Sequence, residues 1–171
     1  MMYATILCCK PRSRKVVSEI IMWRQGLKFS HVVMSVGDRR LDLRKVYEAK
    51  APKVTMSWIN RFMESHQVVE AYVIPLPPTT LVAAERRAIM ALQTPYGFLG
   101  LIGHLVAMIT GRFPRWAMDG SKAEYCVEYL VRVLGISEID ADTADLVIFR
   151  EWLRKNGRLI PLEAVENLNA S

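Results

Sequence analysis

Three residues of this sequence have the types that a thiol-based reaction needs, and Cys126 is the first of them. It lies in AEYCVEYL, after the loop FPRWAMDGSK. A cysteine reacts as the thiolate, which the unpaired amides at a helix N-terminus favour. Ser121 and Glu124 fit a capping box, which predicts a helix from about Lys122. Cys126 would then lie in the second turn, or in the first turn if the helix starts later; the alternative is a buried structural cysteine.

A thiol also needs a base, and the chain has three histidines in different surroundings. His31 lies in FSHVVMSV, where alternation predicts a strand with His31, Val33 and Ser35 on one face. A polar ring in so apolar a strand needs a partner. His66 lies in the polar stretch ESHQ, which predicts an exposed side chain, and His104 lies in an apolar segment typical of a core histidine. His31 is therefore the candidate base.

A third polar group usually orients the base in a site of this kind. Glu48 lies in KVYEAK, the next predicted strand. A carboxylate there can hold the imidazole of His31 through its second nitrogen and stabilise the imidazolium. The alternative is an exposed glutamate paired with Lys50, and Tyr47 would face the site if the strand were turned over.

The elements predicted to position these residues divide the chain into two halves. In the first half, strands are expected at 3–9, 29–37, 44–52 and 67–78, with helices at 13–26 and 56–65. In the second half, helices are expected at 80–93, about 99–110 and about 122–135, followed by a helix or strand–helix pair at 143–157 and a short strand at 158–162. A β-rich first half and a mostly helical second half predict the α+β class.

Length and composition limit the classes of protein to which the chain can belong. With 171 residues, 51% hydrophobic and 23% charged, it fits one domain. The core is expected at about 3–162, with a C-terminal tail at 163–171 that can be mobile. Three cysteines, two of them adjacent, make a poor disulfide framework. The net charge of +6 suits acidic surfaces, but no aromatic-interleaved basic motif indicates nucleic-acid binding.

The sequence has no pattern of a membrane span or a secretion signal. The longest uncharged stretch, YGFLGLIGHLVAMITG, is too short for a bilayer. It is predicted to be a buried helix, with a membrane-contacting segment as the alternative. At the N-terminus the basic cluster follows the short apolar run, the reverse of a signal peptide. We therefore expect a cytoplasmic protein.

The order of these motifs resembles that of a known family, the circularly permuted papain-like hydrolases of the NlpC superfamily, especially the YiiX-like branch. The likeness rests on FSHVVMSV with His31, VYEAKAPKV with Glu48, TPYGFLGL around Tyr96 and EYCVEYLVRVLG with Cys126, and spans about residues 3–135. In that family the histidine strand comes first and the cysteine helix last. The family often has a serine directly after its cysteine, where this chain has Val127.

The resemblance implies a small antiparallel sheet or half-barrel packed against helices, with the cysteine at a helix N-terminus. It implies Cys126 as the nucleophile, His31 as the general base and acid, and Glu48 as the orienting third member. The family's PYD-like turn is PYG at 95–97 here, so any role of an acid there is lost. Three tyrosines are expected to bind substrate: Tyr47, Tyr96 and Tyr125.

The function that the resemblance implies is that of a cysteine hydrolase, without metal or cofactor. It would cleave an amide bond, in a peptide or a peptidoglycan stem peptide, through a thioester acyl-enzyme. One alternative is a lipid-directed acyltransferase or lipase with the same chemistry and peripheral membrane contact, which the apolar segment 98–109 and the basic loop KPRSRK would suit. Another is a catalytically idle binding or structural module. The family suggests a bacterial or phage setting, and a phage protein would act in the virion or the host cytoplasm.

Overall fold

A single antiparallel sheet of six strands forms the centre of the protein. The computed structural model describes residues 2–38, 43–97, 102–103, 106–107, 110–112 and 125–167. The strands are β1 (Met2–Pro11), β2 (His31–Asp38), β3 (Leu43–Lys50), β4 (Lys53–Trp58), β5 (His66–Leu76) and β6 (Arg158–Ile160). Their order across the sheet is β4-β3-β2-β1-β5-β6. The sheet is open, and β1 is central because it pairs with both β2 and β5.

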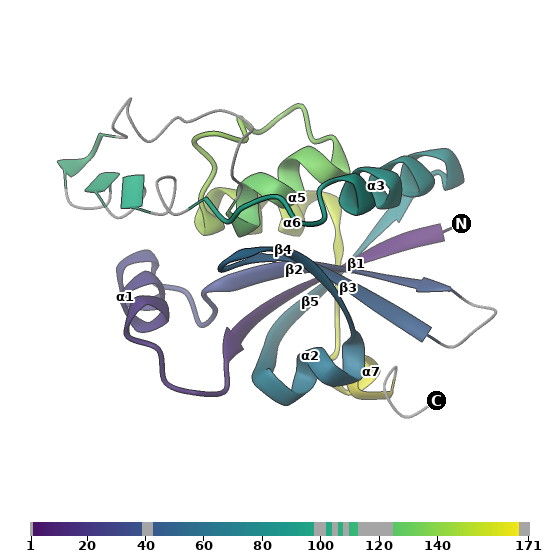
Figure 1. The fold of residues 1–171 in the computed structure, drawn as a ribbon, viewed down its shortest axis with the longest axis horizontal. Helices are drawn as coiled ribbons and strands as arrows, with labels where there is room; N and C mark the ends of the chain where they lie inside the picture. Colours follow the sequence, from purple (N-terminus) through teal and green to yellow (C-terminus); the bar gives the residue numbers. More distant parts are fainter. Residues whose placement is uncertain are drawn as a thin grey trace.

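Helices lie on both faces of this sheet (Figure 1). Among the described residues they are α1 (Val16–Gln25), α2 (Ile59–Ser65), α3 (Pro78–Met90), α5 (Cys126–Leu134), α6 (Leu146–Asn156) and α7 (Leu162–Asn167). Helices α3, α5 and α6 cover one face, α2 and α7 lie on the other, and α1 stands at one end of the sheet (Figure 1). The predicted α+β class is confirmed.

Strand alternation divides the core between the two faces. Val32 and Met34 of β2 pack in the larger cluster, together with the residues of α3, α5 and α6. Val33 packs in the smaller cluster with Ile59 and Phe62 of α2. Successive side chains of a strand point to opposite faces, so His31 shares the face of Val33, as the sequence predicted.

Strand β4 is the main difference from the predicted elements. The stretch 56–65 was predicted to be one helix, but 53–58 pairs antiparallel with β3, and α2 begins only at Ile59. The β-branched Val54 and Thr55 suit a strand, and Val54 is buried. In this register Thr55 lies opposite Glu48, so β4 forms one side of the carboxylate's surroundings.

The core also extends further toward the C-terminus than predicted. Residues 163–171 were expected to be a tail that can be mobile, but α7 covers 162–167 and Val165 is 1% exposed. Val165 packs in the same cluster as Phe62 and Val68, so this apolar residue fixes α7 beneath the sheet. The expected boundary near residue 162 is therefore corrected.

Two predictions fall on parts of the chain that are not fully described. Most of the apolar helix expected at about 99–110, with His104, lies outside the described residues, although those that are described at 102–103, 106–107 and 110 are helical. Ser121 and Glu124 of the expected capping box also lie outside them. Within the described residues, no helix is both long enough and apolar enough to cross a bilayer.

Candidate functional site

Cys126 is the first residue of helix α5. Tyr125 before it is extended, with φ −98° and ψ 170°, and its hydroxyl donates a hydrogen bond to the carbonyl of Ala144. That bond fixes the residue before the helix in a non-helical conformation, so α5 starts at Cys126 and not at about Lys122. The later start, considered above as the alternative, places the thiol in the first turn. There the amide N–H groups have no acceptor within the helix.

Helix α5 is held firmly because nearly all of it is buried. Eight of its nine residues are buried, and the helix packs against β2 and β3. Gly135 ends it with φ +70°, and the amide of Gly135 donates to carbonyls of the last turn. The left-handed conformation favours glycine at this position. The N-terminus of α5 is therefore fixed relative to the strands that carry His31 and Glu48.

His31 begins strand β2. It pairs with Cys9 of β1, whose thiol donates to the carbonyl of His31 at 3.6 Å. The imidazole side chain is only 14% exposed, and its Nε2 lies 3.4 Å from Oε2 of Glu48. This separation is that of an ion pair and exceeds that of a well-aligned hydrogen bond. Because Nε2 faces the carboxylate, Nδ1 is the nitrogen that remains for proton exchange with a thiol.

Glu48 is fully buried in β3, next to β2 in the sheet. Its Oε1 accepts a hydrogen bond from the ammonium of Lys50, and its Oε2 is the atom that faces His31. A buried carboxylate is costly unless cations compensate it. The two partners here supply that compensation from the same strand and from the neighbouring one. Glu48 thus contacts both His31 and Lys50, and the exposed position considered as the alternative is wrong because the side chain is fully buried.

The electrostatics of the site centre on His31. Burial alone would lower the pKa of the imidazole, but a hydrogen bond with the side chain of Cys126, the Glu48 carboxylate and their charges raise this pKa to about 9. Burial would likewise raise the pKa of Glu48, but the interactions with His31 and Lys50 lower it to about 2. Both shifts favour an imidazolium beside a carboxylate. His31 and Glu48 are therefore a close pair, and the raised pKa of His31 also includes an interaction with the side chain of Cys126.

His66 is a further member that the sequence did not indicate. It was expected to be exposed, but it is partly buried, and its ring centroid lies 5.9 Å from that of His31. Its ring stacks on Phe62 at 4.4 Å, and the hydroxyl of Ser65 lies 2.9 Å from its Nδ1. Burial, followed by the charge of His31, lowers the pKa of His66 to about 4. The polar neighbours in ESHQ indicated an exposed side chain. The sequence signal for the observed packing was the apolar Phe62, four residues before His66.

The three tyrosines expected to bind substrate lie in different places. Tyr47 is on the face of β3 opposite Glu48, and its hydroxyl donates to Glu85 of α3 at 3.1 Å. Tyr125 directs its hydroxyl to the carbonyl of Ala144. Tyr96 is half-buried, and burial followed by the charge of Cys126 raises the pKa of its hydroxyl. The charge of Cys126 also raises the pKa of the Tyr125 hydroxyl, after burial, so Tyr96 and Tyr125 both lie within the electrostatic reach of the thiol.

The other two thiols have a different character. Cys8 and Cys9 are both fully buried in the central strand β1 and form no disulfide. Burial raises the pKa of both thiols well above their ordinary value. They therefore remain protonated at neutral pH, and neither is placed at a helix N-terminus. Cys126 is buried as well, at 6% exposure, but it differs from the other two in lying at a helix N-terminus.

Within the described ranges, no cluster of histidine, cysteine and acidic residues could hold a metal ion. Comparison with known proteins adds no relative: no protein-family model matches the sequence, and no curated protein matches it significantly. The chemistry of the site therefore has to be argued from its own residues.

Proposed function

We propose that the protein is a cysteine hydrolase in which Cys126 is the nucleophile, His31 the general base and acid, and Glu48 the residue that orients His31. The observation that carries the proposal is the environment of His31: its imidazole lies 3.4 Å from a buried carboxylate, and its pKa is raised in part by the thiol that begins α5. This set of nucleophile, base and orienting group is what covalent acyl transfer requires. In this proposal the fold is a circularly permuted papain-like fold of the NlpC type.

The proposed reaction begins from an ion pair in which His31 already holds the proton of the Cys126 thiol. The sulfur attacks the carbonyl carbon of an amide, and the N–H of Cys126 donates to the developing oxyanion. The C–N bond then breaks as His31 gives its proton to the leaving nitrogen, which leaves a thioester on Cys126. A water molecule then attacks the thioester carbonyl, and His31 accepts a proton from that water. The C–S bond breaks, the acid is released, and the proton returns to the thiol–imidazole pair.

Glu48 contributes to each of these steps through His31. Its charge stabilises the imidazolium that both halves of the reaction form. Because the carboxylate is buried and held by Lys50, it restrains the ring with Nε2 toward β3. The role proposed for Glu48 is therefore that of a positioning residue, and it touches no substrate atom.

Two classes of substrate fit this chemistry. The first is an amide, such as a peptide or a peptidoglycan stem peptide. The second is a lipid ester, processed by hydrolysis or by transfer to another acceptor. The observation that favours the second class is the exposed apolar face of α1, a helix that ends six residues before His31. That observation is developed in the next subsection.

Trapping the acyl-enzyme tests the proposed function. The chain is mixed with a short soluble acyl thioester, quenched in acid and analysed by intact and peptide mass spectrometry. We expect one acyl adduct on Cys126 and continuing release of the free acid. Cys126→Ala should show neither, whereas Cys9→Ala, which removes a buried thiol of β1, should retain both. Absence of any adduct on the wild-type chain, or an adduct unaffected by His31→Ala, would contradict the proposal.

A further inference from the structure

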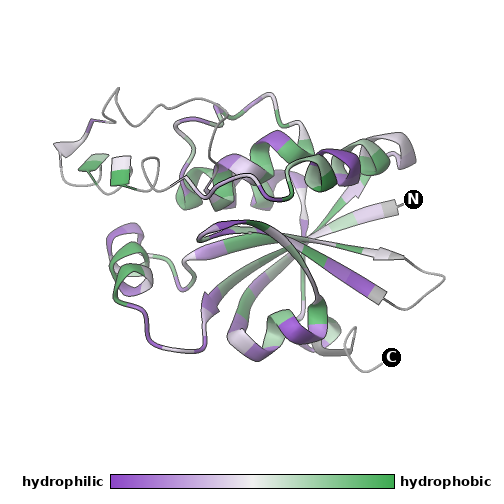
Figure 2. Cartoon of the chain, viewed as in Figure 1, coloured by the Kyte–Doolittle hydropathy of each residue, from purple (hydrophilic) through white to green (hydrophobic). Residues whose placement is uncertain are grey.

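Helix α1 exposes the apolar face that an amphipathic helix normally buries. Val16, Val17, Ile20 and Trp23 are 70%, 48%, 43% and 77% exposed, and Ile21 is the only buried residue of the helix. Val16, Ile20 and Trp23 follow the i, i+4, i+7 spacing of a single helix face. The helix stands at the end of the sheet, with apolar residues along it (Figures 1 and 2). An exposed patch of this kind marks an interaction surface.

Basic side chains surround this apolar face. The exposed cations before, within and after the helix are Arg12, Arg14, Lys15, Arg24 and Lys28. Glu19 is the only acidic residue in 10–28, and the guanidinium of Arg14 pairs with it at 2.6 Å. The surface of α1 is therefore an apolar stripe with a positively charged border.

That combination identifies the chemistry of the occupant. A helix with a bulky apolar face and a basic border lies in the interface of a bilayer, where its apolar side chains enter the acyl boundary. The indole of a tryptophan is suited to the headgroup level. The cations attract anionic headgroups at the membrane surface. A protein partner would have to supply both an apolar groove and an acidic border, whereas an anionic membrane supplies both at once.

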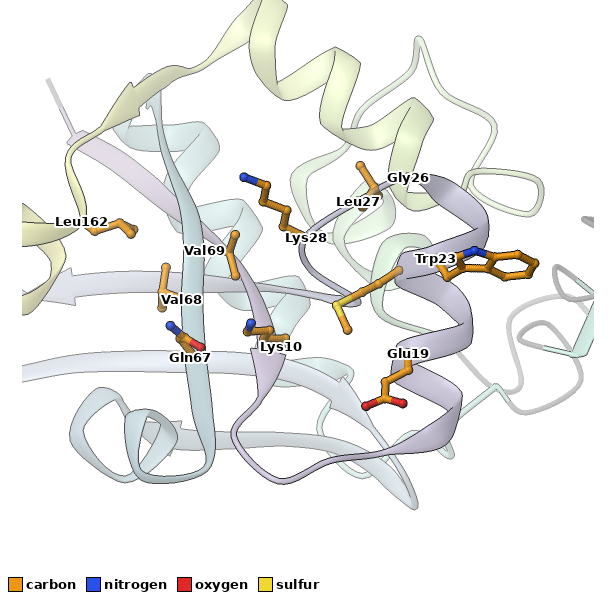
Figure 3. A pocket seen from close by; sticks show the side chains of 11 residues that line it. Lys10, Glu19, Trp23, Gly26, Leu27, Lys28, Gln67, Val68, Val69 and Leu162 are labelled. Carbon is orange, nitrogen blue, oxygen red and sulfur yellow. The ribbon is translucent and has the colours of Figure 1, made fainter.

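An apolar hollow lies directly behind the same helix. It has a volume of about 640 Å³ and lies between α1, β1 and β5. Leu27 and Val69 contribute apolar surface, while Lys10 and Lys28 place two cations and Glu19 one carboxylate at it (Figure 3). Lys10 directly follows Cys9, the residue that pairs with His31. The hollow thus lies at the end of the sheet that carries the proposed base.

We propose that α1 docks the protein on an anionic lipid surface and that the hollow behind it receives an acyl chain of a lipid ester that Cys126 attacks. The docking itself depends only on α1 and its basic border. The second step rests on the proposed function and selects lipid esters as its substrate class. Docking through α1 would place the start of β2, and with it His31, next to the bilayer.

Flotation with vesicles tests the docking. The full chain is mixed with vesicles of phosphatidylcholine and phosphatidylserine, or of phosphatidylcholine alone, and separated on a density gradient. We expect flotation with the anionic vesicles, weakened by salt, and little with the neutral ones. The double variant Ile20→Ser, Trp23→Ser should lose roughly tenfold or more in binding, because it removes the inserted apolar area. The matched control is Val82→Ser, Trp58→Ser, which changes two exposed apolar residues away from α1.

Charge variants test the basic border. Arg24→Glu, Lys28→Glu should weaken binding to anionic vesicles by roughly tenfold or more. Arg61→Glu, Lys155→Glu makes the same change of net charge at exposed positions of α2 and α6 and should weaken binding far less. Equal loss in both pairs, or no binding by the wild-type chain, would overturn the docking proposal. Light scattering gives a further contrary outcome. If the wild-type chain is a dimer, the Ile20, Trp23 variant is a monomer and neither binds vesicles, then the face of α1 joins two copies of the chain and the docking proposal is wrong.

Two substrates separate the failure of docking from the failure of the proposed function. The variant Val16→Ser, Ile20→Ser changes two exposed residues of α1 that do not line the hollow; it should turn over the short soluble thioester like the wild type and lose turnover of a lipid ester presented in anionic vesicles. Cys126→Ala, in contrast, should lose turnover of both the soluble thioester and the vesicle-borne ester. If the soluble thioester is turned over but the vesicle-borne ester is untouched by the wild type, the lipid step is wrong while the hydrolase remains.

Discussion

Nε2 of His31 lies 3.4 Å from Oε2 of Glu48, and the carboxylate is fully buried. Burial lowers the pKa of the imidazole, and the Glu48 carboxylate is one of the groups that raise it. The variant Glu48→Gln replaces this carboxylate by a neutral group of the same shape. We expect the pKa of His31 to fall from about 9 toward its ordinary value of 6.5. NMR titration of the ring protons measures it. Glu70→Gln, which removes a carboxylate paired with Arg150 elsewhere on the sheet, is the control and should leave His31 unchanged.

The same variant should affect the proposed catalysis. Loss of the group that orients the base lowers kcat/KM by roughly 10²–10⁴-fold in comparable sites. The fall should appear mainly in kcat, because Glu48 is buried away from solvent. The wild-type rate should also decline as the pH rises through about 9, where His31 loses the proton that the leaving group needs. In Glu48→Gln the decline should begin at a lower pH; an unchanged profile would show that Glu48 does not act through His31.

Alkylation should distinguish the three thiols. Iodoacetamide at neutral pH is expected to modify Cys126 before Cys8 and Cys9, because burial in β1 raises the pKa of those two thiols and keeps them protonated. Peptide mass spectrometry identifies the modified site. In His31→Ala the rate at Cys126 should fall by roughly tenfold or more, since the base that stabilises the thiolate is gone. Faster modification of Cys8 or Cys9 in the native protein would contradict this assignment.

The stability of the fold should depend on pH through the same pair. The pKa of His31 is raised from 6.5 to about 9, so its contribution is fully present below pH 6.5 and is lost as the pH rises through about 9. Thermal unfolding should therefore occur at lower temperature on the alkaline side, and the decline over this window should be smaller in Glu48→Gln. Other groups titrate at alkaline pH, so the difference between the two chains is the relevant quantity. Parallel curves would argue against the ion pair.

His66 predicts the opposite dependence on the acid side. Its pKa is lowered from 6.5 to about 4, so the unfolded chain binds a proton in this window that the folded chain does not. The free energy of unfolding should consequently decrease as the pH falls from 6.5 to 4. In His66→Phe, which can keep the stacking on Phe62, this part of the decrease should disappear. Denaturant titrations at a series of pH values measure it, and an equal loss in both chains would refute the assignment to His66.

The candidate residues could be selected from the sequence by their local surroundings. His31 is polar in an apolar strand, and Cys126 lies at the start of a strongly apolar stretch, which the structure shows as helix α5. The role of Glu48 was harder to predict, because the alternation of side chains along the strand did not decide whether its partner is Lys50 or His31. The fully buried carboxylate contacts both, which a choice between single partners did not anticipate.

The misses arose where tertiary packing outweighed local pattern. Residues 56–58 were predicted as the start of a helix, but they continue strand β4, which pairs along the edge of β3. His66 has polar neighbours, yet its ring is covered by Phe62 and lies beside His31. The apolar spacing of α1 was correctly predicted as a helix, but periodicity alone does not reveal whether its apolar face meets a core or solvent.

The chain order of the site has a consequence for synthesis of the protein. The imidazole–carboxylate pair forms between two adjacent strands joined by one hairpin, a contact of low sequence separation. The thiol of Cys126 arrives on a helix from the second half of the chain. During translation the strands carrying His31 and Glu48 thus emerge long before that thiol. The network is completed only when α5 docks, so a partly synthesised chain carries the base without its nucleophile.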